Sequence, residues 1–267
     1  MWRWLKMNLG RILALLKRDN TIMNRSKWRI IEWIYFPVLS LFIWGFFSIF
    51  ARQFAAQIAI MVLIIQIYFE FAQLAQATAN QTMMEDVWRG TFRELMLTPL
   101  TSLEYLFSRI IHSGLRSMAT LAILFVGAFT FFGANILVQN IFFFLMIAGL
   151  TYLASAAVSI IVSSLILTLG TEYGFLSWSS TQFLVLLSAP FFPITIFPLA
   201  LQYVSYFMPY TWIFESIRQF VTSNTVCYTC LQYSAISNVA YIAISLPLFL
   251  YCFRRAIRTG ALARFWR

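Results

Sequence analysis

A short charged segment, residues 80–104, lies between two long apolar runs and holds residue types suited to binding another protein. Gly90 permits a tight turn in this segment. Thr91, followed three residues later by Glu94, matches a capping box, in which two side chains satisfy the free N–H groups at a helix start. Pro99 then ends the helix, because proline lacks the N–H that a helix needs. We therefore expect a helix of about two turns between the two breaks.

This expected helix has an apolar face, made by Phe92, Leu95 and Met96. An apolar helix face suits a hydrophobic groove on a soluble partner. The alternative is a solvated connector between neighbouring helices, although a connector alone does not need so apolar a helix.

A polar stripe runs along the second long apolar run. Gln66, Glu70, Gln73 and Asn80 share one helical face there, and Gln76 lies beside it. A carboxylate inside a membrane span costs roughly 2.5–3.5 kcal/mol on insertion scales. The stripe should therefore face other helices or a hydrated pathway. We expect Gln66, Glu70 and Gln73 to line a pathway. Hydrogen bonding between helices is the alternative, because amide side chains serve that purpose as well.

Prolines interrupt the apolar residues 188–234 every few positions, at Pro190, Pro193, Pro198 and Pro209. Non-helical backbone is tolerated at membrane depth only inside protein or beside a water-filled cavity. We therefore expect re-entrant half-helices on the outer side of the membrane. An ordinary amphipathic external loop is the alternative.

Two residue pairs in this outer region have chemistry of their own. Glu215 and Arg218 are three residues apart and would neutralise each other on one half-helix, either within a gate or as a structural pair. The external gate region that we expect consists of Pro198, Pro209, Glu215 and Arg218. Cys227 and Cys230 would form a local disulfide in an oxidising compartment, or remain two reduced thiols.

Several kinds of chemistry find no suitable residues in the sequence. The lysines are Lys6, Lys17 and Lys27, and none lies in a glycine-rich loop, so the chain cannot bind nucleotide through a P-loop. The single histidine, His112, argues against a histidine-rich metal site. The sequence contains neither a nucleophile elbow nor a pair of catalytic carboxylates. We expect no catalytic residue, and no metal or cofactor bound by this chain.

The composition of the chain indicates that these residues lie in a protein embedded in a lipid bilayer. Of the 267 residues, 61% are hydrophobic and 10% are charged, whereas soluble domains have about 45–50% and 25%. In lipid such a surface needs no cover, and helices satisfy their own backbone hydrogen bonds. The net charge is +10, and the basic residues gather mainly at the two ends. This distribution is typical of cytoplasmic termini, so we expect membrane lipids and not nucleic acid as partners.

The apolar runs predict an all-α polytopic membrane protein with six transmembrane helices, at residues 31–51, 54–79, 105–132, 136–169, 173–190 and 235–253. Six spans would place both termini and residues 80–104 in the cytoplasm. Residues 31–267 then form a single transmembrane domain. Residues 1–30 are expected to form an amphipathic helix on the inner leaflet, or one packed on a protein partner. Its apolar face would consist of Trp2, Leu5, Leu9, Ile12, Leu13 and Leu16.

Two segments resemble permeases of the ABC-2-type transporter family. The first is residues 85–104, with the pattern E-x-x-x-R-G-T-x-x-E-L-x-x-T-P-L-x-x-x-E, which is similar to the signature loop of that family. The second is residues 197–218, F-P-L-A-L-Q-Y-V-S-Y-F-M-P-Y-T-W-x-x-E-x-x-R, which is similar to the proline-bearing segment before the last span. The chain length, the span count and the basic N-terminal helix fit as well, so the resemblance covers the whole chain.

The resemblance implies the membrane subunit of an ATP-driven exporter for an amphiphile, such as a glycan, a lipid-linked glycan or a drug. It also implies a homodimer in the inner (plasma) membrane, with two copies of a separate ATPase subunit that bind ATP and Mg²⁺. By the same resemblance, the region coupled to the ATPase consists of Glu85, Arg89, Gly90, Thr91, Glu94, Leu95 and Pro99. A secondary transporter and a membrane-embedded enzyme that modifies lipids or glycans are the alternatives.

Overall fold

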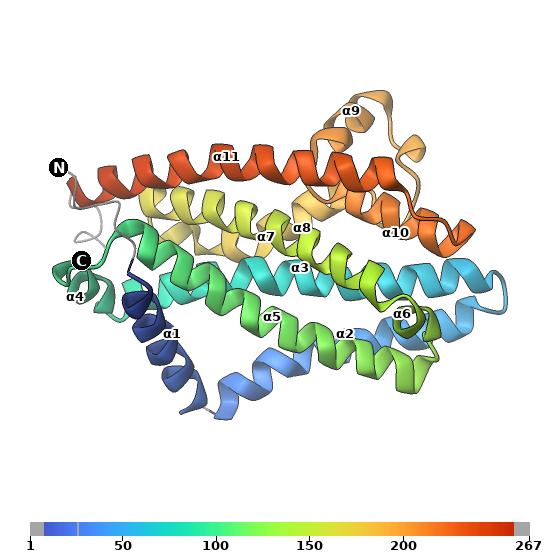
Figure 1. Ribbon diagram of the computed structural model, residues 1–267, viewed down its shortest axis with the longest axis horizontal. Coiled ribbons are helices and arrows are strands. Elements are labelled where there is room, and N and C mark those ends of the chain that lie inside the picture. Colours follow the sequence, from blue (N-terminus) through green and yellow to red (C-terminus); the bar gives the residue numbers. More distant parts are fainter. Residues whose placement is uncertain (1–7, 26, 259–267) are drawn as a thin grey trace.

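The computed structural model describes residues 8–25 and 27–258, which form a long bundle of helices (Figure 1). The described residues are 87% helical and contain no strand. Helices are the expected solution, because a segment in lipid must satisfy its backbone hydrogen bonds internally. The predicted all-α polytopic membrane fold is therefore confirmed.

Five helices in the described ranges are long and apolar enough to cross a membrane: α2 (Lys27–Ala51), α3 (Ala56–Trp88), α5 (Ser102–Phe132), α7 (Ile141–Leu169) and α11 (Tyr228–Arg258). The central helix is α3, which packs against α2, α5 and α7 and buries Tyr68 and Phe71 completely. Large apolar side chains of the outer helices point away from the bundle, such as Phe46 of α2 and Ile244 of α11. This arrangement is typical of helices that face lipid.

The predicted fifth span is a broken element. It consists of the 3₁₀ turn η1 (Thr171–Phe175) and α8 (Leu176–Leu187), whose 12 residues extend about 18 Å, less than the roughly 30 Å of a bilayer core. α8 lies along the half of α3 that leads to Trp88, where Thr181 donates a hydrogen bond to Gln76. α10 (Thr211–Ser223) lies along the other half of the bundle, where Phe220 stacks on Phe143 at the start of α7. The span count of six stays a prediction.

The chain between α8 and α10 leaves the bundle and returns to it. It contains the 3₁₀ turn η2 (Ile194–Ile196) and α9 (Leu199–Phe207), which projects from the side of the bundle in Figure 1. The expected breaks at prolines are present, because Pro198 directly precedes α9 and Pro209 separates α9 from α10.

The two ends of the bundle differ in what they hold. One end, which we call the α4 end, contains α1 (Leu9–Asn24), α4 (Thr91–Leu97) and the last turns of α11 (Figure 1). At the opposite end, which we call the α6 end, Arg52 donates a hydrogen bond to the carbonyl of Phe132. The short helix α6 (Asn135–Gln139) follows there and is separated from α7 at Asn140. The fourth predicted span therefore begins at Ile141 and not at residue 136.

The N-terminal helix α1 packs on its own chain, mainly against α5. Its buried side chains are Ile12, Leu15, Asp19 and Met23. Of the expected apolar face, Ile12 is buried, Leu9 and Leu13 are 74% and 63% exposed, and Trp2 and Leu5 lie outside the described residues. α1 thus packs one side on its own chain, and its position on the inner leaflet or on a protein partner stays a prediction.

Candidate functional site

The turn that begins the candidate site follows directly from α3. Residues 80–88, which were expected in the loop, extend α3 as far as Trp88. Gly90 then has φ +75°, a left-handed conformation that glycine adopts without steric cost. α4 begins at the next residue, so the predicted tight turn at Gly90 is confirmed.

The capping box that was predicted at Thr91 and Glu94 is wrong. Gly90 occupies the N-cap position of α4, and no side chain caps that helix. The capping box lies ten residues later, at the start of α5, where Thr101 accepts from the N–H of Glu104 at 3.2 Å and Glu104 accepts from the N–H of Thr101 at 2.8 Å. The hydroxyl of Thr91 instead donates to Asp86 Oδ1 at 3.2 Å.

Glu104 also connects α5 to α1. Its buried carboxylate accepts a hydrogen bond from the N–H of Asn8 at 2.7 Å and lies 3.4 Å from Arg11. Arg11 donates in turn to the carbonyl of Pro99 at 2.6 Å. Hydrogen bonds that involve a charged group are about twice as strong as neutral ones. The chain segment after α4 is therefore fixed to α1.

A buried cluster of ion pairs lies beside α4, which we call the Asp86 cluster: Arg18, Asp19, Asp86 and Arg109. Arg18 Nη2 lies 2.9 Å from Asp19 and 2.6 Å from Asp86. Arg109 Nη1 lies 2.7 Å from Asp19 and 3.7 Å from Asp86. Burial lowers the pKa of Arg18, but the carboxylates of Asp86 and Asp19 outweigh this effect and leave that pKa raised. Two positive and two negative charges therefore balance inside the protein.

Sequence reasoning missed the Asp86 cluster as a site. Its members come from α1, α3 and α5, and Asp19 and Arg109 are 90 positions apart, so no local pattern joins them. A signal was present nonetheless. Arg109 lies inside an apolar run, where an ionisable group needs a partner, and Asp19 lies on the buried face of α1.

α4 exposes less apolar surface than expected. Phe92 is only 3% exposed, and its ring lies 5.4 Å from that of Tyr105. Leu95 packs half-buried against the core, and the side chain of Met96 lies outside the description. The accessible side of α4 and its C-terminal turn consists of Glu94, Leu97, Thr98 and Pro99. A partner would therefore meet this surface, because the apolar face already packs on the bundle.

A cavity of about 720 Å³ lies between α1, α2, α3, α5 and α8. It reaches from Glu70 in the middle of α3 to Asp86 and Thr91 beside α4. Glu70 and Asp86 lie on the same helix, about 24 Å apart along its axis at 1.5 Å per residue. The aromatic part of the lining consists of Trp33, Phe36, Phe69 and Trp178. The cavity therefore extends to the residues that hold α4.

The predicted polar stripe divides into two groups. Glu70 and Gln73 border the cavity, and Gln66 donates a hydrogen bond to Glu70 at 3.1 Å. Gln76 and Asn80 instead accept hydrogen bonds from α8 and α7 at 2.7–2.9 Å. Gln76 and Asn80 thus bond neighbouring helices, whereas Glu70 and Gln73 border the cavity. The role of Gln66, Glu70 and Gln73 in a pathway stays a prediction.

Comparison with protein families identifies the chain. The family model described as ABC-2 type transporter matches residues 10–222, which include the Asp86 cluster, α4 and the helices around the cavity. The chain belongs to this family. It is thus the membrane permease of an ABC transporter, and permeases of this family work with an ABC ATPase partner. No curated protein matches the chain.

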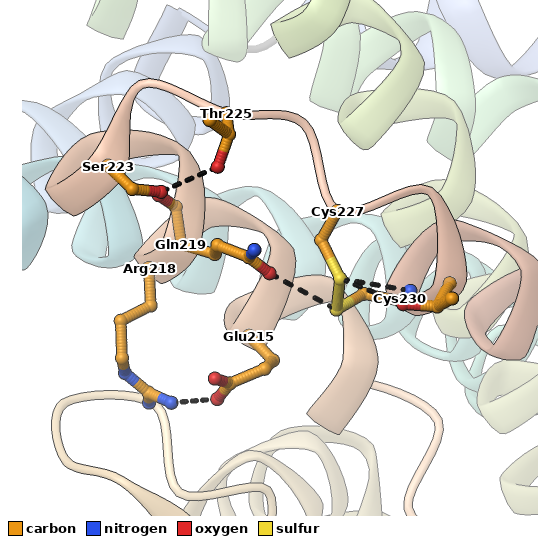
Figure 2. Close-up of a disulfide and its surroundings, with 8 residues drawn as sticks. Glu215, Arg218, Gln219, Ser223, Thr225, Cys227 and Cys230 are labelled. Atoms are coloured by element: carbon orange, nitrogen blue, oxygen red, sulfur yellow. Dashed lines mark hydrogen bonds and ion pairs between the residues drawn. A yellow bond between two sulfur atoms is a disulfide. The ribbon is translucent and has the colours of Figure 1, made fainter.

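The ABC-2 permease holds the loop between α8 and η2 through Arg218 of α10, which Figure 2 shows paired with Glu215. The guanidinium pairs with Glu215 and donates to the carbonyls of Ala189 and Phe192, each at 2.8 Å, and of Pro190 at 3.3 Å. These contacts hold the chain between α8 and η2 against α10. The structure thus brings Glu215 and Arg218 together in a pair that also supports a loop, and their role in a gate stays a prediction.

The permease contains the disulfide Cys227–Cys230, just before and within the first turn of α11. The Cys230 sulfur lies 3.9 Å from the side-chain oxygen of Gln219 in α10 (Figure 2). Of the two states considered for this pair, the structure has the bonded one. The bond lies next to the helix that carries Glu215 and Arg218.

Proposed function

We propose that this permease is half of an ATP-driven exporter, in which two copies of the chain surround a central pathway. Two copies of an ATPase subunit, which bind ATP and Mg²⁺, dock at the α4 end. That end and both termini then face the cytoplasm, in the inner (plasma) membrane, and the substrate is an amphiphile.

The observation that carries this proposal is the position of Asp86. Its carboxylate lines the cavity and also accepts hydrogen bonds from Thr91, the first residue of α4, and from Tyr105 of α5 at 2.9 Å. Any movement of α4 therefore acts on the wall of the cavity through Asp86. A change of conformation at the ATPase would reach the substrate by this route.

The residues expected to couple the ATPase divide by position. Gly90, Thr91 and Leu95 hold α4 in place, because they form its turn, its bond to Asp86 and its contact with the core. Glu94 and Pro99 are exposed at the end of the molecule. The Glu85–Arg89 ion pair, at 3.6 Å, lies at the last turn of α3 beside the cavity. We assign the direct contact with the ATPase to the exposed members together with Leu97.

Isolation of the tagged permease from its native membrane tests this proposal. Wild-type permease should bring an ABC ATPase with it. Glu94→Arg combined with Leu97→Asp should weaken ATPase binding about thirtyfold or more, since charge reversal and an acidic group at a central contact each cost about 1 kcal/mol or more. The melting temperature and membrane insertion should not change, because both side chains are exposed.

Val138→Asp is the matched control, because it places the same charge on an exposed apolar position of α6 at the opposite end. Undiminished recovery of the ATPase with the double variant would contradict the assignment of α4. Transport by the purified chain without any ATPase would contradict the proposal as a whole.

A further inference from the structure

Glu70 differs from the other carboxylates that line the cavity. It forms no ion pair with any described side chain, and its polar partners are Gln66 and Ser40. Its carboxylate nevertheless borders the cavity in the middle of a helix that is long enough to cross a membrane. A charge held at this depth is costly unless a partner neutralises it.

The other acidic residues of the cavity already have cations. Asp19 and Asp86 pair with arginines of the Asp86 cluster, and Glu85 pairs with Arg89. Arg116, which also lines the cavity, lies over the ring of Trp33 at 5.2 Å. Within the described residues, Glu70 is therefore the acidic group of the cavity without a protein cation.

Aromatic side chains line the same cavity as Glu70. Phe69 is its neighbour on α3, and Phe36 and Trp178 line the same cavity. Phe36 and Trp178 are also 60% and 51% exposed, so this side of the cavity opens to the outside of the bundle. Aromatic faces attract cations as well as apolar groups. A molecule entering from the bilayer would thus meet apolar surface first and a carboxylate deeper inside.

We propose that this cavity binds an amphiphile that carries a protonated amine, with the ammonium group on Glu70 and the apolar body among Phe36, Phe69 and Trp178. This inference rests on the proposed transport function and names the class of its substrate. The volume of about 720 Å³ lies within the range of roughly 300–1,000 Å³ of small-molecule sites.

Charge separates this class from the other amphiphiles. A neutral glycan headgroup would find amides in the cavity, such as Gln73 and Gln182, but would leave the charge of Glu70 without a counter-ion. An anionic headgroup placed beside Glu70 would be repelled, because like charges at short range disfavour each other. The lining includes arginines, but those that pair with acidic residues pair with Asp19, Asp86 and Glu85. A cation therefore supplies the partner that Glu70 lacks.

Binding to the permease alone tests the inference, with full-length protein in phosphatidylcholine nanodiscs and no ATPase. The probe is the cationic dye rhodamine 6G, followed by fluorescence polarisation and corrected with empty nanodiscs. Three competitors share a twelve-carbon tail and differ in headgroup charge: dodecylamine, dodecyl maltoside and dodecyl sulfate, each below its micellar concentration. Dodecylamine should displace the dye, and the other two should not.

Variants at Glu70 locate the site. Glu70→Gln keeps the shape of the side chain and should weaken dye binding about tenfold or more, which corresponds to about 1.4 kcal/mol. Glu70→Asp keeps the charge on a shorter side chain and should lose less affinity. Glu172→Gln removes an exposed carboxylate outside the cavity lining and should leave binding unchanged. Melting temperatures show whether each variant is folded. The comparison of the three competitors on wild-type protein tests the inference without any variant.

Three results would overturn the inference: no saturable binding of the dye, equal binding to Glu70→Gln, or displacement by dodecyl maltoside as effective as by dodecylamine. The last result would indicate a glycan site. These failures are distinct from failure of the proposed function. If the ATPase is recovered with Glu70→Gln but the dye does not bind to wild type, only the substrate class is wrong. If the dye binds but no ATPase is recovered, the site stands and the coupling at α4 does not.

Discussion

The α4 end and the proline-broken region of residues 188–234, which we expect on the outer side and call the outer region, both hold short helices against the bundle, but by different means. At the α4 end the contacts join residues far apart in sequence: Arg18 to Asp86, Asn8 to Glu104 and Arg109 to Asp19. In the outer region the contacts are nearer in sequence. Arg218 reaches its own helix and a loop 26 to 29 residues away, and the disulfide spans three positions.

This difference indicates whether a movement in each region is passed to distant helices. The buried charges of the Asp86 cluster come from α1, α3 and α5, so a displacement of one helix leaves charges unpaired on the others. In the interior such a loss is costly, and the three helices should therefore move together. The loop between α8 and η2 is bonded by Arg218 of α10, so a change in this loop should act first on α10, which packs in turn against α3, α7 and α11.

Asp86→Ala should have the largest effect on stability, because it removes an acceptor at the centre of the Asp86 cluster. Two arginines of the cluster would then share the single carboxylate of Asp19, and Thr91 and Tyr105 would lose their acceptor. We expect the free energy of unfolding to fall by about 3–5 kcal/mol, the usual cost of an uncompensated buried charge. Thermal and denaturant unfolding of the permease in nanodiscs measure this loss.

Glu172→Ala provides the control for Asp86→Ala, because it removes an exposed carboxylate from the turn after α7. We expect its effect to stay within about 0.5 kcal/mol, as at most surface positions. Equal effects of the two substitutions would mean that the Asp86 cluster contributes no more than surface charge.

A smaller effect is expected from Arg218→Met in the outer region. The substitution keeps much of the apolar stem but removes the donors to three carbonyls, one of them on Ala189, whose φ of +48° is unfavourable for a residue with a side chain. We expect a loss of about 2–3 kcal/mol, since hydrogen bonds to charged groups contribute about 1.5–3 kcal/mol. Faster proteolytic cleavage within residues 188–198 would accompany this loss, while recovery of the ATPase should not change.

Glu215→Gln separates the ion pair from the loop contacts. It should cost clearly less than Arg218→Met, because Arg218 keeps its bonds to Ala189 and Phe192. Loss of ATPase binding in the Arg218 variant would contradict the independence of the two regions.

The bundle could be predicted from the sequence, because a membrane leaves long apolar segments almost no choice but the helix. The ends of the helices were harder to predict. Residues 80–88 include polar side chains such as Glu85 and Asp86, yet they continue α3 to Trp88, since polar residues alone do not end a helix. The sequence contains Thr-x-x-Glu patterns at Thr82, Thr91 and Thr101. Thr82 lies inside α3, and only backbone conformation distinguishes the other two. Thr101 is extended, with φ −89° and ψ 155°, as an N-cap residue must be, whereas Gly90 already occupies that position before Thr91.

Only part of the candidate site could be predicted in the same way. Glu70 was found because a carboxylate in an apolar run is conspicuous, but its lack of a cation depends on where every arginine lies in space. The inward packing of Phe92 was missed because its partners Tyr105 and Phe253 belong to two other helices. An apolar helix face predicts burial, but the sequence does not say against which surface.

Gly90→Ala should have a small effect on stability. It tests whether the position of α4, and not only its exposed side chains, determines docking. At φ +75° an added Cβ costs about 1–2 kcal/mol, while every member of the Asp86 cluster remains. Gly149→Ala is the matched control, because an added Cβ there meets no atom within 4 Å and alanine favours the helix. Recovery of the ATPase, measured beside the melting temperature, should fall in the Gly90 variant and not in the control. Such a result would show that the position of α4, and not only its exposed side chains, determines docking. Normal recovery would mean that α4 tolerates a shifted turn, and that the Asp86 cluster alone fixes its place.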